Sequence, residues 1–245
     1  MQRLWPDPGE VDDLAGLVAG EARPTHADRP WLLVNMISSL DGAIAIDGRS
    51  GGLGTPADKA VFRALRGIAD VILVGAGTAR AEGYGPPKPT DATRAARVAR
   101  GQSPAPRLAL VTRSVDFDLD SPLFVDAEER PFVIAAGDAD PARLAAVAEV
   151  AEVIVTGQAA VDLPASFARL HDAGVGLIAG EGGPRLNGDL LGDELIDEWN
   201  LSISPLLVGG DAARAVVGAP PGSRPFRLDR LLEGDGLLFS RWLRR

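Results

Sequence analysis

Short, almost wholly apolar runs recur along the chain, and they constrain its fold more than any other feature. The first is Trp31–Ile37, a run of seven residues with a single polar side chain. Similar runs follow at 71–74, 108–111, 131–135, 153–155 and 175–179. Runs of this kind are typical of strands that are buried on both faces. Segments with a helical pattern separate them, so the chain is predicted to be α/β, with a central, largely parallel sheet flanked by helices.

The first of these helices is predicted directly after a glycine-rich loop at 47–54. Thr55 is a suitable N-cap, and Pro56 suits the first helical position. The apolar residues that would line one face of this helix are Val61, Phe62, Leu65 and Ile68.

The two ends of the chain and one central segment differ from this pattern. Residues 1–30 are polar and rich in proline, with one short helical pattern near 11–18, so we expect an N-terminal appendage to one domain over 31–245. Segment 86–102 is basic and proline-rich without apolar periodicity, which predicts a mobile surface segment. Residues 237–242 are expected to close the chain as an edge strand.

Charge and cysteine content exclude several classes of function. The chain has 25 basic and 34 acidic residues, a net charge of −9, which disfavours nucleic acid and anionic membranes as partners. It has no cysteine, and His26 and His171 are isolated, so we expect no metal site. No run approaches the roughly 18 apolar residues of a membrane span, and no secretory signal is visible. These features fit a cytoplasmic protein.

Glycines follow two of the predicted strands, at the place where ligands bind in open α/β sheets. Gly75 and Gly77 precede Thr78, and Gly182-Gly183 precedes a predicted helix. Paired glycines at a helix N-terminus let backbone N–H groups approach a phosphate. Neither segment completes G-x-G-x-x-G, so a conventional Rossmann domain is disfavoured, and no GxxxxGK[ST] motif indicates a P-loop.

A third strand ends in Thr112-Arg113-Ser114. An arginine flanked by hydroxyls suits the 2′-phosphate of NADP, because the planar guanidinium can bond two phosphate oxygens. The alternative is an ordinary surface arginine. Four carboxylates also fall near these loops, although each taken alone is typical of a turn or a helix cap: Asp41, Asp58, Glu82 and Glu181.

In combination, four motifs resemble the reductase domain of riboflavin biosynthesis, which has a dihydrofolate reductase-like fold. The motifs are Ser38-Ser39-Leu40-Asp41-Gly42, Leu65-Arg66, VILVGAGT at 71–78 and Glu181-Gly182-Gly183-Pro184. The resemblance extends from about Trp31 to the C-terminus. It implies an NADPH-dependent oxidoreductase that converts 5-amino-6-ribosylaminouracil 5′-phosphate to the ribitylamino compound, with hydride going to C1′ of the opened ribose.

The resemblance also assigns roles to single residues. Those on the cofactor side are Ser38, Gly75, Gly77, Thr78, Glu82, Thr112, Arg113, Ser114, Gly182, Gly183, Pro184, Arg185 and Leu186. Ser50, Arg66 and Glu181 fall at its substrate-contacting positions, and Asp41 and Lys88 are further substrate-binding candidates. The candidate catalytic carboxylates are Glu181 and Asp58, of which Asp58 is not assigned by this resemblance. A homodimer is also implied, for which the apolar stretch 201–208 is a candidate surface.

The sequence departs from the family pattern around the substrate. Ala43 replaces the Lys or Arg that usually follows the SLDG-like turn, the loop 51–54 lacks the usual Trp, and Lys88 is the cation left near the substrate phosphate. Asp58 instead resembles the active-site carboxylate of folate reductases, which can bind a pterin and support its protonation at N5. We therefore hypothesise additional activity on dihydrofolate.

Two further expectations concern the type of protein. The zinc deaminase of bifunctional relatives needs H-x-E and PCxxC motifs, which are absent here, so a stand-alone reductase is expected. A folate-type reductase is one alternative to the riboflavin-type reductase. A catalytically idle NADP-binding protein is another, from a different functional class.

Overall fold

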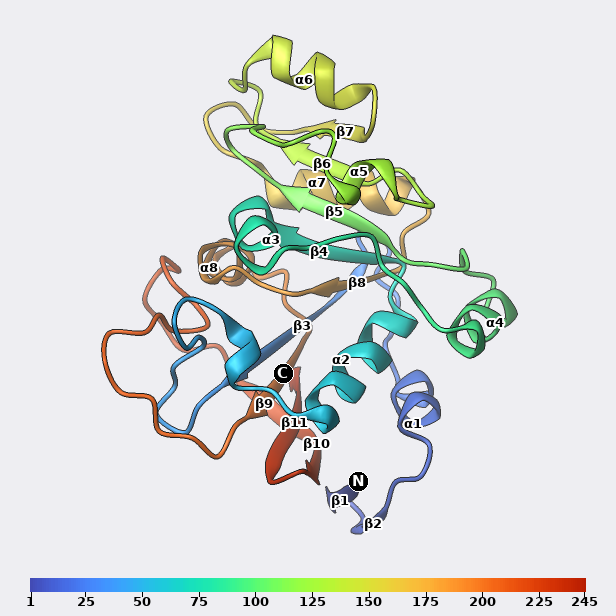
Figure 1. Cartoon of the computed structure of the whole chain (residues 1–245), viewed down its shortest axis with the longest axis vertical. Helices are drawn as coiled ribbons and strands as arrows, with labels where there is room; N and C mark the ends of the chain where they lie inside the picture. Colours follow the sequence, from blue (N-terminus) through green and yellow to red (C-terminus); the bar gives the residue numbers. More distant parts are fainter. The chain divides into compact units, whose positions relative to one another are not determined.

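The computed structural model describes residues 1–245, and the chain divides into two compact units. The first unit comprises Met1–Arg23, Leu32–Ile68 and Ala179–Arg245, and the second comprises Pro24–Trp31 and Ala69–Ile178. Strands and helices are present in both units (Figure 1). The predicted α/β fold with a central, mostly parallel sheet is confirmed.

Parallel strands form the framework of the second unit. In order of pairing they are β4 (Val71–Gly75), β5 (Arg107–Val111), β6 (Phe132–Ala135) and β7 (Glu152–Val155). The helices are α3 (Ala76–Glu82), α4 (Asp91–Ala99), α5 (Pro122–Val125), α6 (Pro141–Ala148) and α7 (Leu163–Asp172). Side chains such as Ile72, Leu110 and Val133 are completely buried in the core. The apolar runs thus form strands, and burial on both faces explains why these runs are almost wholly apolar.

Antiparallel pairing dominates the first unit. Its strands follow the order β2 (Gly9–Glu10), β1 (Gln2–Trp5), β10 (Phe226–Gly234), β11 (Leu237–Arg244), β9 (Glu198–Ile203) and β3 (Trp31–Ser38). β3 and β9 are parallel, and the other pairs are antiparallel. Its helices are α1 (Leu14–Gly20), α2 (Pro56–Ile68) and α8 (Pro184–Gly192). β8 (Leu177–Gly180) starts in the second unit and ends in the first.

The prediction that 237–242 is an edge strand is wrong. β11 is hydrogen-bonded to β10 on one side and to β9 on the other. Its neighbour β10 was not predicted, because its sequence, FRLDRLLEG, carries charged residues at Arg227, Asp229 and Arg230 that interrupt the apolar pattern. Arg230 is nevertheless buried, so an ion pair has replaced apolar packing at this place.

Segment 86–102, for which a mobile surface segment is predicted, contains a helix that the sequence pattern does not indicate. Residues 91–99 form α4, and Thr90 caps it by accepting a hydrogen bond from the N–H of Thr93. Arg97 takes the place of the expected apolar anchor, since it is 1% exposed and donates to the carbonyls of Ala69 and Ser103. Burial lowers the pKa of Arg97 to about 10. A buried arginine in a basic segment carries no apolar signal, so the pattern missed it.

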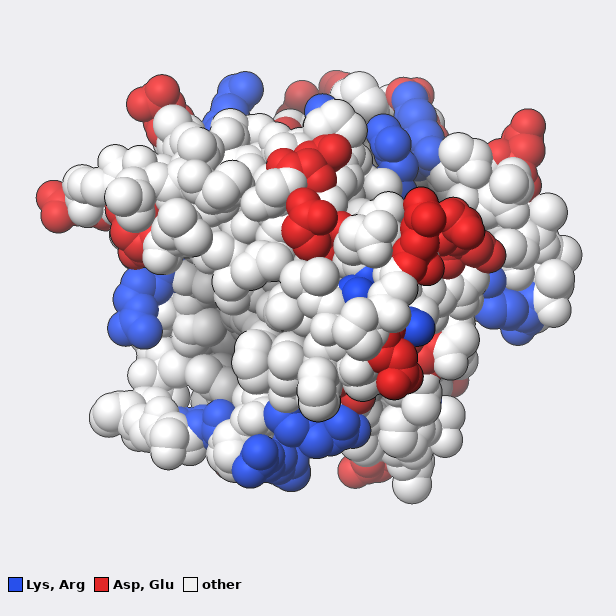
Figure 2. Space-filling view, turned by 90° about the horizontal axis from the view of Figure 1, so that it is seen from below, with Lys and Arg blue, Asp and Glu red and all other residues white.

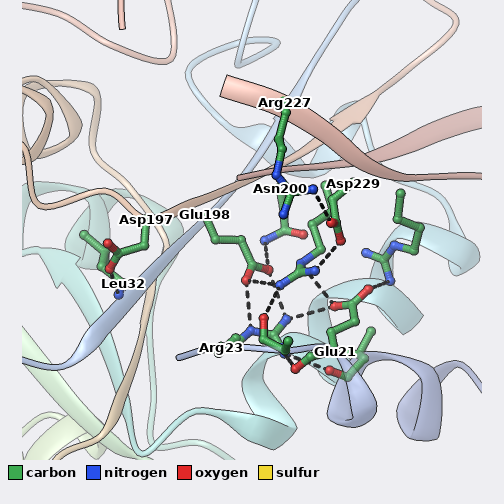
Figure 3. A network of polar contacts seen from close by, with 12 residues as sticks. Glu21, Arg23, Leu32, Asp197, Glu198, Asn200, Arg227 and Asp229 are labelled. Atoms are coloured by element: carbon green, nitrogen blue, oxygen red, sulfur yellow. Dashed lines mark hydrogen bonds and ion pairs between the residues drawn. The ribbon is translucent and has the colours of Figure 1, made fainter. Parts of the chain in front are cut away.

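A buried ion network holds the N-terminal segment against β9 and β11 (Figure 3). Arg23 donates to both carboxylate oxygens of Glu198, at 2.9 and 3.0 Å. Arg241 donates to Glu198 at 2.9 Å and to the carbonyl of Ala22 at 3.0 Å. Glu21 lies 2.9 Å from Arg230. β1 also pairs with β10, so residues 1–23 are an integral part of the first unit.

Candidate functional site

Helix α2 carries two predicted site residues, Asp58 and Arg66, and a turn distant in sequence contacts its start. Pro56 occupies the first helical position, as predicted. The N–H of Ala57 donates to the carboxylate of Asp235 at 2.8 Å. Asp235 lies in the turn between β10 and β11, with φ 52°. The first turn of α2 is thus capped by Asp235, which is distant in sequence and lies near α2 only in the folded protein.

The predicted substrate residues Arg66 and Glu181 form a bidentate ion pair. Nε and Nη2 of Arg66 each donate to one carboxylate oxygen of Glu181 at 2.6 Å. Arg66 lies in the last turn of α2, and Glu181 directly follows β8. The Arg66 side chain is 24% exposed and that of Glu181 is 3% exposed. A ligand approaching this pair would therefore meet the guanidinium before the carboxylate.

The carboxylate of Asp58 is partly buried near the start of α2. Burial raises its pKa, while a hydrogen bond with the hydroxyl of Ser202 on β9 and the charge of Lys59 lower it. A Cβ added at Gly54 would lie 2.8 Å from Oδ2 of Asp58, so glycine leaves the room that this carboxylate needs. The environment favours the protonated acid more than water does.

Asp41 joins two loops that leave the ends of β3 and β9. Its carboxylate accepts hydrogen bonds from the hydroxyl of Ser39 and from the N–H groups of Val208, at 3.2 Å, and Gly209, at 2.7 Å. These bonds, the one from Ser39 foremost, lower the pKa of Asp41 to about 2. The observed role is to fasten the loops, and the substrate-binding role stays a prediction. Ser38, at the end of β3, is buried.

The Gly182-Gly183 turn joins β8 to α8. Gly182 has φ 92°, and an added Cβ would lie 3.2 Å from Sδ of Met36, so both conformation and space favour glycine here. Gly183 is the N-cap of α8, and Pro184 takes its first position, followed by Arg185 and Leu186. The turn thus lies at a helix start, as predicted, and its role in binding an anion stays a prediction.

In the second unit, β4 ends at Gly75 and α3 begins at the next residue. Thr78 and Glu82 both lie on α3. A Cβ added at Gly77 would meet nothing within 4 Å, so this part of α3 presents open backbone. β4 thus leads directly into α3, and the cofactor role of these residues stays a prediction.

The loop after β5 holds a strained residue. Val115 has φ 49°, which is unusual for a β-branched side chain, and it is buried. The hydroxyl of Thr112 accepts a hydrogen bond from the N–H of Val115 at 3.1 Å and supports this conformation. Strain of this kind persists where surrounding contacts hold it and is often found at ligand sites.

Two arginines that the sequence prediction missed converge on the same loop. Arg143 donates to the carbonyl of Ser114 at 3.0 Å, and Arg80 donates to the carbonyl of Asp116 at 3.0 Å. Arg113 directly precedes Ser114 in the chain and is exposed. Arg80 lies on α3 and Arg143 on α6, so these two arginines reach the loop that contains Arg113 only in the folded unit. Arg80 and Arg143 thus hold the backbone of the loop that contains Arg113, and Arg143 also lies 3.8 Å from the carboxylate of Asp116.

The predicted site residues are divided between the two units. The first unit contains Ser38, Asp41, Ser50, Asp58, Arg66, Glu181, Gly182, Gly183, Pro184, Arg185 and Leu186. The second unit contains Gly75, Gly77, Thr78, Glu82, Lys88, Thr112, Arg113 and Ser114. Ser50 begins a short 3-10 turn, and Lys88 is exposed between α3 and α4. A cradle formed jointly by Gly182-Gly183 and Arg113 stays a prediction.

Sequence reasoning also gave no role to Phe62 and Ser202. Phe62 was placed on the apolar face of α2, but its ring lies against the guanidinium of Arg66, with 4.1 Å from Cζ to the ring centroid. The i, i+4 spacing of Phe62 and Arg66 was the available signal. Ser202 had none, because its contact with Asp58 depends on the pairing of β9.

Other kinds of site have little support in the structure. No group of three or more His, Asp or Glu side chains is arranged to hold a metal ion. None of the helices has both the length and the apolarity needed to cross a bilayer. On the face shown in Figure 2, acidic and basic side chains form small separate groups among uncharged residues. A broad basic surface of the kind that binds nucleic acid is not seen on that face.

A family profile described as the RibD C-terminal domain matches residues 30–233. The chain is 33% identical over 192 residues to the 2,5-diamino-6-ribosylamino-4(3H)-pyrimidinone 5′-phosphate reductase of Methanothermobacter thermautotrophicus, an alignment that covers 77% of this chain and 84% of that protein. It is 29% identical over 204 residues to the Archaeoglobus fulgidus reductase of the same name, covering 83% and 93%.

Solved structures share the fold. A pyrimidine reductase-like protein from Corynebacterium diphtheriae superimposes with a TM-score of 0.84 at 30% identity, covering 94% of this chain and 98% of that one. The riboflavin biosynthesis reductase Rib7 of Saccharomyces cerevisiae gives a TM-score of 0.67 at 17% identity, covering 93% and 94%. The latter likeness concerns the fold alone.

Proposed function

Because the chain belongs to the RibD C-terminal domain family, we propose that it reduces a ribosylaminopyrimidine 5′-phosphate of riboflavin biosynthesis with NADPH. The Arg66–Glu181 ion pair carries this proposal. Two residues that are 115 positions apart, both predicted to contact the substrate, meet directly before the Gly182-Gly183 turn. The archaeal relatives are named as reductases of the 2,5-diamino compound. We therefore propose this compound as the preferred substrate over the 5-amino uracil compound.

The backbone and charges of the chain fit NADPH at two places. Gly182 and Gly183 at the start of α8 would hold its pyrophosphate, because helix N-termini attract anions. Arg113, in the loop whose backbone Arg80 and Arg143 contact, would hold the 2′-phosphate by charge-assisted hydrogen bonds. When bound, NADPH supplies the hydride that reduces the substrate.

The remaining task of the protein is to bind and orient the pyrimidine. Arg66 offers a partly exposed guanidinium whose position is set by Glu181. Bidentate pairing limits rotation of the guanidinium and so preorganises it for a ring carbonyl of the substrate. Asp58 carries a proton more readily than an exposed aspartate does, because burial raises its pKa. It can therefore donate that proton, a property that the second candidate activity below would use.

Asp58 also supports a second candidate activity, the reduction of a pterin such as dihydrofolate. A partly buried carboxyl group that hydrogen-bonds the hydroxyl of Ser202 can accept bonds from the amino and ring N–H groups of a pterin. When protonated, it can support protonation of the pterin ring during reduction. The two candidate activities would use the same cofactor, and they differ only in the compound that the substrate pocket binds.

We also propose that the protein is a cytoplasmic homodimer. Leu207 is 78% exposed and Leu206 is 40% exposed, within the predicted stretch 201–208. Leu40 adds to this patch, since its N–H donates to the carbonyl of Leu206 at 2.8 Å. Contiguous exposed leucines commonly mark an interface. Sedimentation should show a dimer that Leu207→Asp converts to a monomer, and a monomeric wild-type protein would refute the proposal.

Nicotinamide absorbance provides the test of the proposed function. NADPH should be consumed with the 2,5-diamino ribosylaminopyrimidine phosphate, and more slowly with its uracil counterpart. Consumption with dihydrofolate alone would instead identify a folate-type reductase. Binding of NADPH without consumption in any mixture would identify the idle NADP-binding protein, and absence of NADPH binding would exclude all three.

The cofactor arm of the same experiment compares NADPH with NADH. Arg113→Ala should raise the KM for NADPH about tenfold, the expected size of one lost charge-assisted hydrogen bond. Because NADH lacks the 2′-phosphate, its KM should stay unchanged. Arg63→Ala, which removes an exposed arginine on α2, serves as the control and should alter neither value. Equal effects of Arg113→Ala on both cofactors would contradict the assignment.

A further inference from the structure

The guanidinium of Arg66 is fixed from two directions. Along one edge, Nε and Nη2 donate to Glu181, at 2.6 Å each. Across its face, Cζ lies 4.1 Å from the ring centroid of Phe62, one helical turn earlier on α2. The carboxylate limits rotation within the guanidinium plane, and the ring limits tilting of that plane. Together the two contacts define both the position and the orientation of the group.

We propose that Phe62 is a positioning residue that holds the guanidinium plane of Arg66 for binding the pyrimidine ring. The proposal rests on the proposed function. Arg66 remains 24% exposed, whereas Glu181 is 3% exposed, so ligand contact falls on the guanidinium that Phe62 supports. Phe62 acts through Arg66 and takes no part in the chemistry.

An aromatic ring is suited to this role for a physical reason. The face of a phenylalanine ring attracts a cation within about 6 Å of its centroid, an attraction that an aliphatic side chain lacks. Glu181 alone would allow the guanidinium to swing about the line of its two hydrogen bonds. Without the ring, part of the binding energy of the substrate would be used to order Arg66.

Nuclear magnetic resonance tests the positioning without any substrate. The Nε–H proton of Arg66, identified by its loss in Arg66→Lys, should be shielded by the ring of Phe62 in the wild-type protein. In Phe62→Leu, which keeps an apolar side chain of similar size, this shielding should disappear. In Phe62→Tyr it should remain. The same Arg66 resonance in all three proteins would overturn the proposal.

Kinetics test the consequence for binding. Phe62→Leu should raise the KM for the ribosylaminopyrimidine phosphate about fivefold and change kcat and the KM for NADPH less than twofold, as expected for a lost cation–π contact. Phe62→Tyr should restore the wild-type KM. Arg63→Ala, an exposed arginine on the same helix, is the control. Equal effects of Phe62→Leu on both KM values would indicate general loss of packing and overturn the proposal.

The two arms separate the positioning role from the function. If no pyrimidine is reduced by the wild-type protein, the proposed function fails, while a ring-dependent Arg66 resonance still supports positioning by Phe62. If pyrimidine is reduced but the resonance does not depend on the ring, the positioning role fails and the function stands. Thermal unfolding of each variant confirms that the comparison is made between folded proteins.

Discussion

Glu198→Gln should lower the free energy of unfolding by about 3–5 kcal/mol, the range found when one partner of a buried ion pair is removed. Glu198 is completely buried and accepts hydrogen bonds from Arg23 and Arg241. Glutamine keeps the shape of the side chain but removes its charge. The buried guanidinium groups of Arg23 and Arg241 would then lose one shared counter-ion and keep Glu21, with Asp229 also paired to Arg241.

Urea unfolding followed by circular dichroism measures this loss, and Glu152→Gln provides a matched control. Glu152 also pairs with an arginine, Arg107 at 2.8 Å, but its side chain is 52% exposed. Solvent screens an exposed pair, so the control should lose less than about 1 kcal/mol. Equal losses in the two variants would show that burial of the network contributes nothing to its strength.

The pH dependence of stability gives an independent measure of the same network. Burial alone would raise the pKa of Glu198, but Arg23 and Arg241 outweigh it and lower the pKa from 4.5 to about 2. A carboxylate with a depressed pKa stabilises the folded protein above its unfolded pKa, and this stabilisation is lost as pH falls from about 4.5 toward 2. The Glu198→Gln variant should lose less stability over that interval than the wild-type protein does.

The parts of the fold that the sequence predicted are those with apolar periodicity. The run VILV at 71–74 and the helix after Thr55-Pro56 were located to within about a residue, because burial of apolar side chains determines both. β10 and α4 were missed because buried arginines, Arg230 and Arg97, hold them in place. Arginine becomes an interior residue only when the fold supplies its partners, and two of these partners, Ala69 and Glu21, are distant in sequence.

The site shows the same division. Arg66 and Glu181 were assigned together from the family resemblance, and their ion pair agrees with that grouping. Phe62, Ser202 and Arg143 act through contacts that α2, β9 and α6 create on folding. Such side chains have ordinary identities and occur outside recognisable motifs. Their roles follow from geometry, which the sequence alone does not contain.

Asp58→Asn should lower kcat/KM for dihydrofolate at least about 100-fold, the lower range for loss of a general acid. Asparagine keeps the size of the side chain, but its amide has no proton to give to a pterin ring. Turnover of the ribosylaminopyrimidine phosphate should change less than threefold if Arg66 is the main anchor of that substrate. Steady-state assays of both substrates, with saturating NADPH, make the comparison.

Ser202→Ala provides the companion variant because it alters only the environment of Asp58. Burial raises the pKa of Asp58, and the hydroxyl of Ser202 is one of the groups that oppose this rise. Dihydrofolate turnover should therefore fall as pH increases through the raised pKa, and without the hydroxyl this fall should move to higher pH. Unchanged dihydrofolate turnover in Asp58→Asn would remove the acid role. If Ser202→Ala leaves the pH dependence of dihydrofolate turnover unchanged, the fall in turnover reflects the titration of a group other than Asp58.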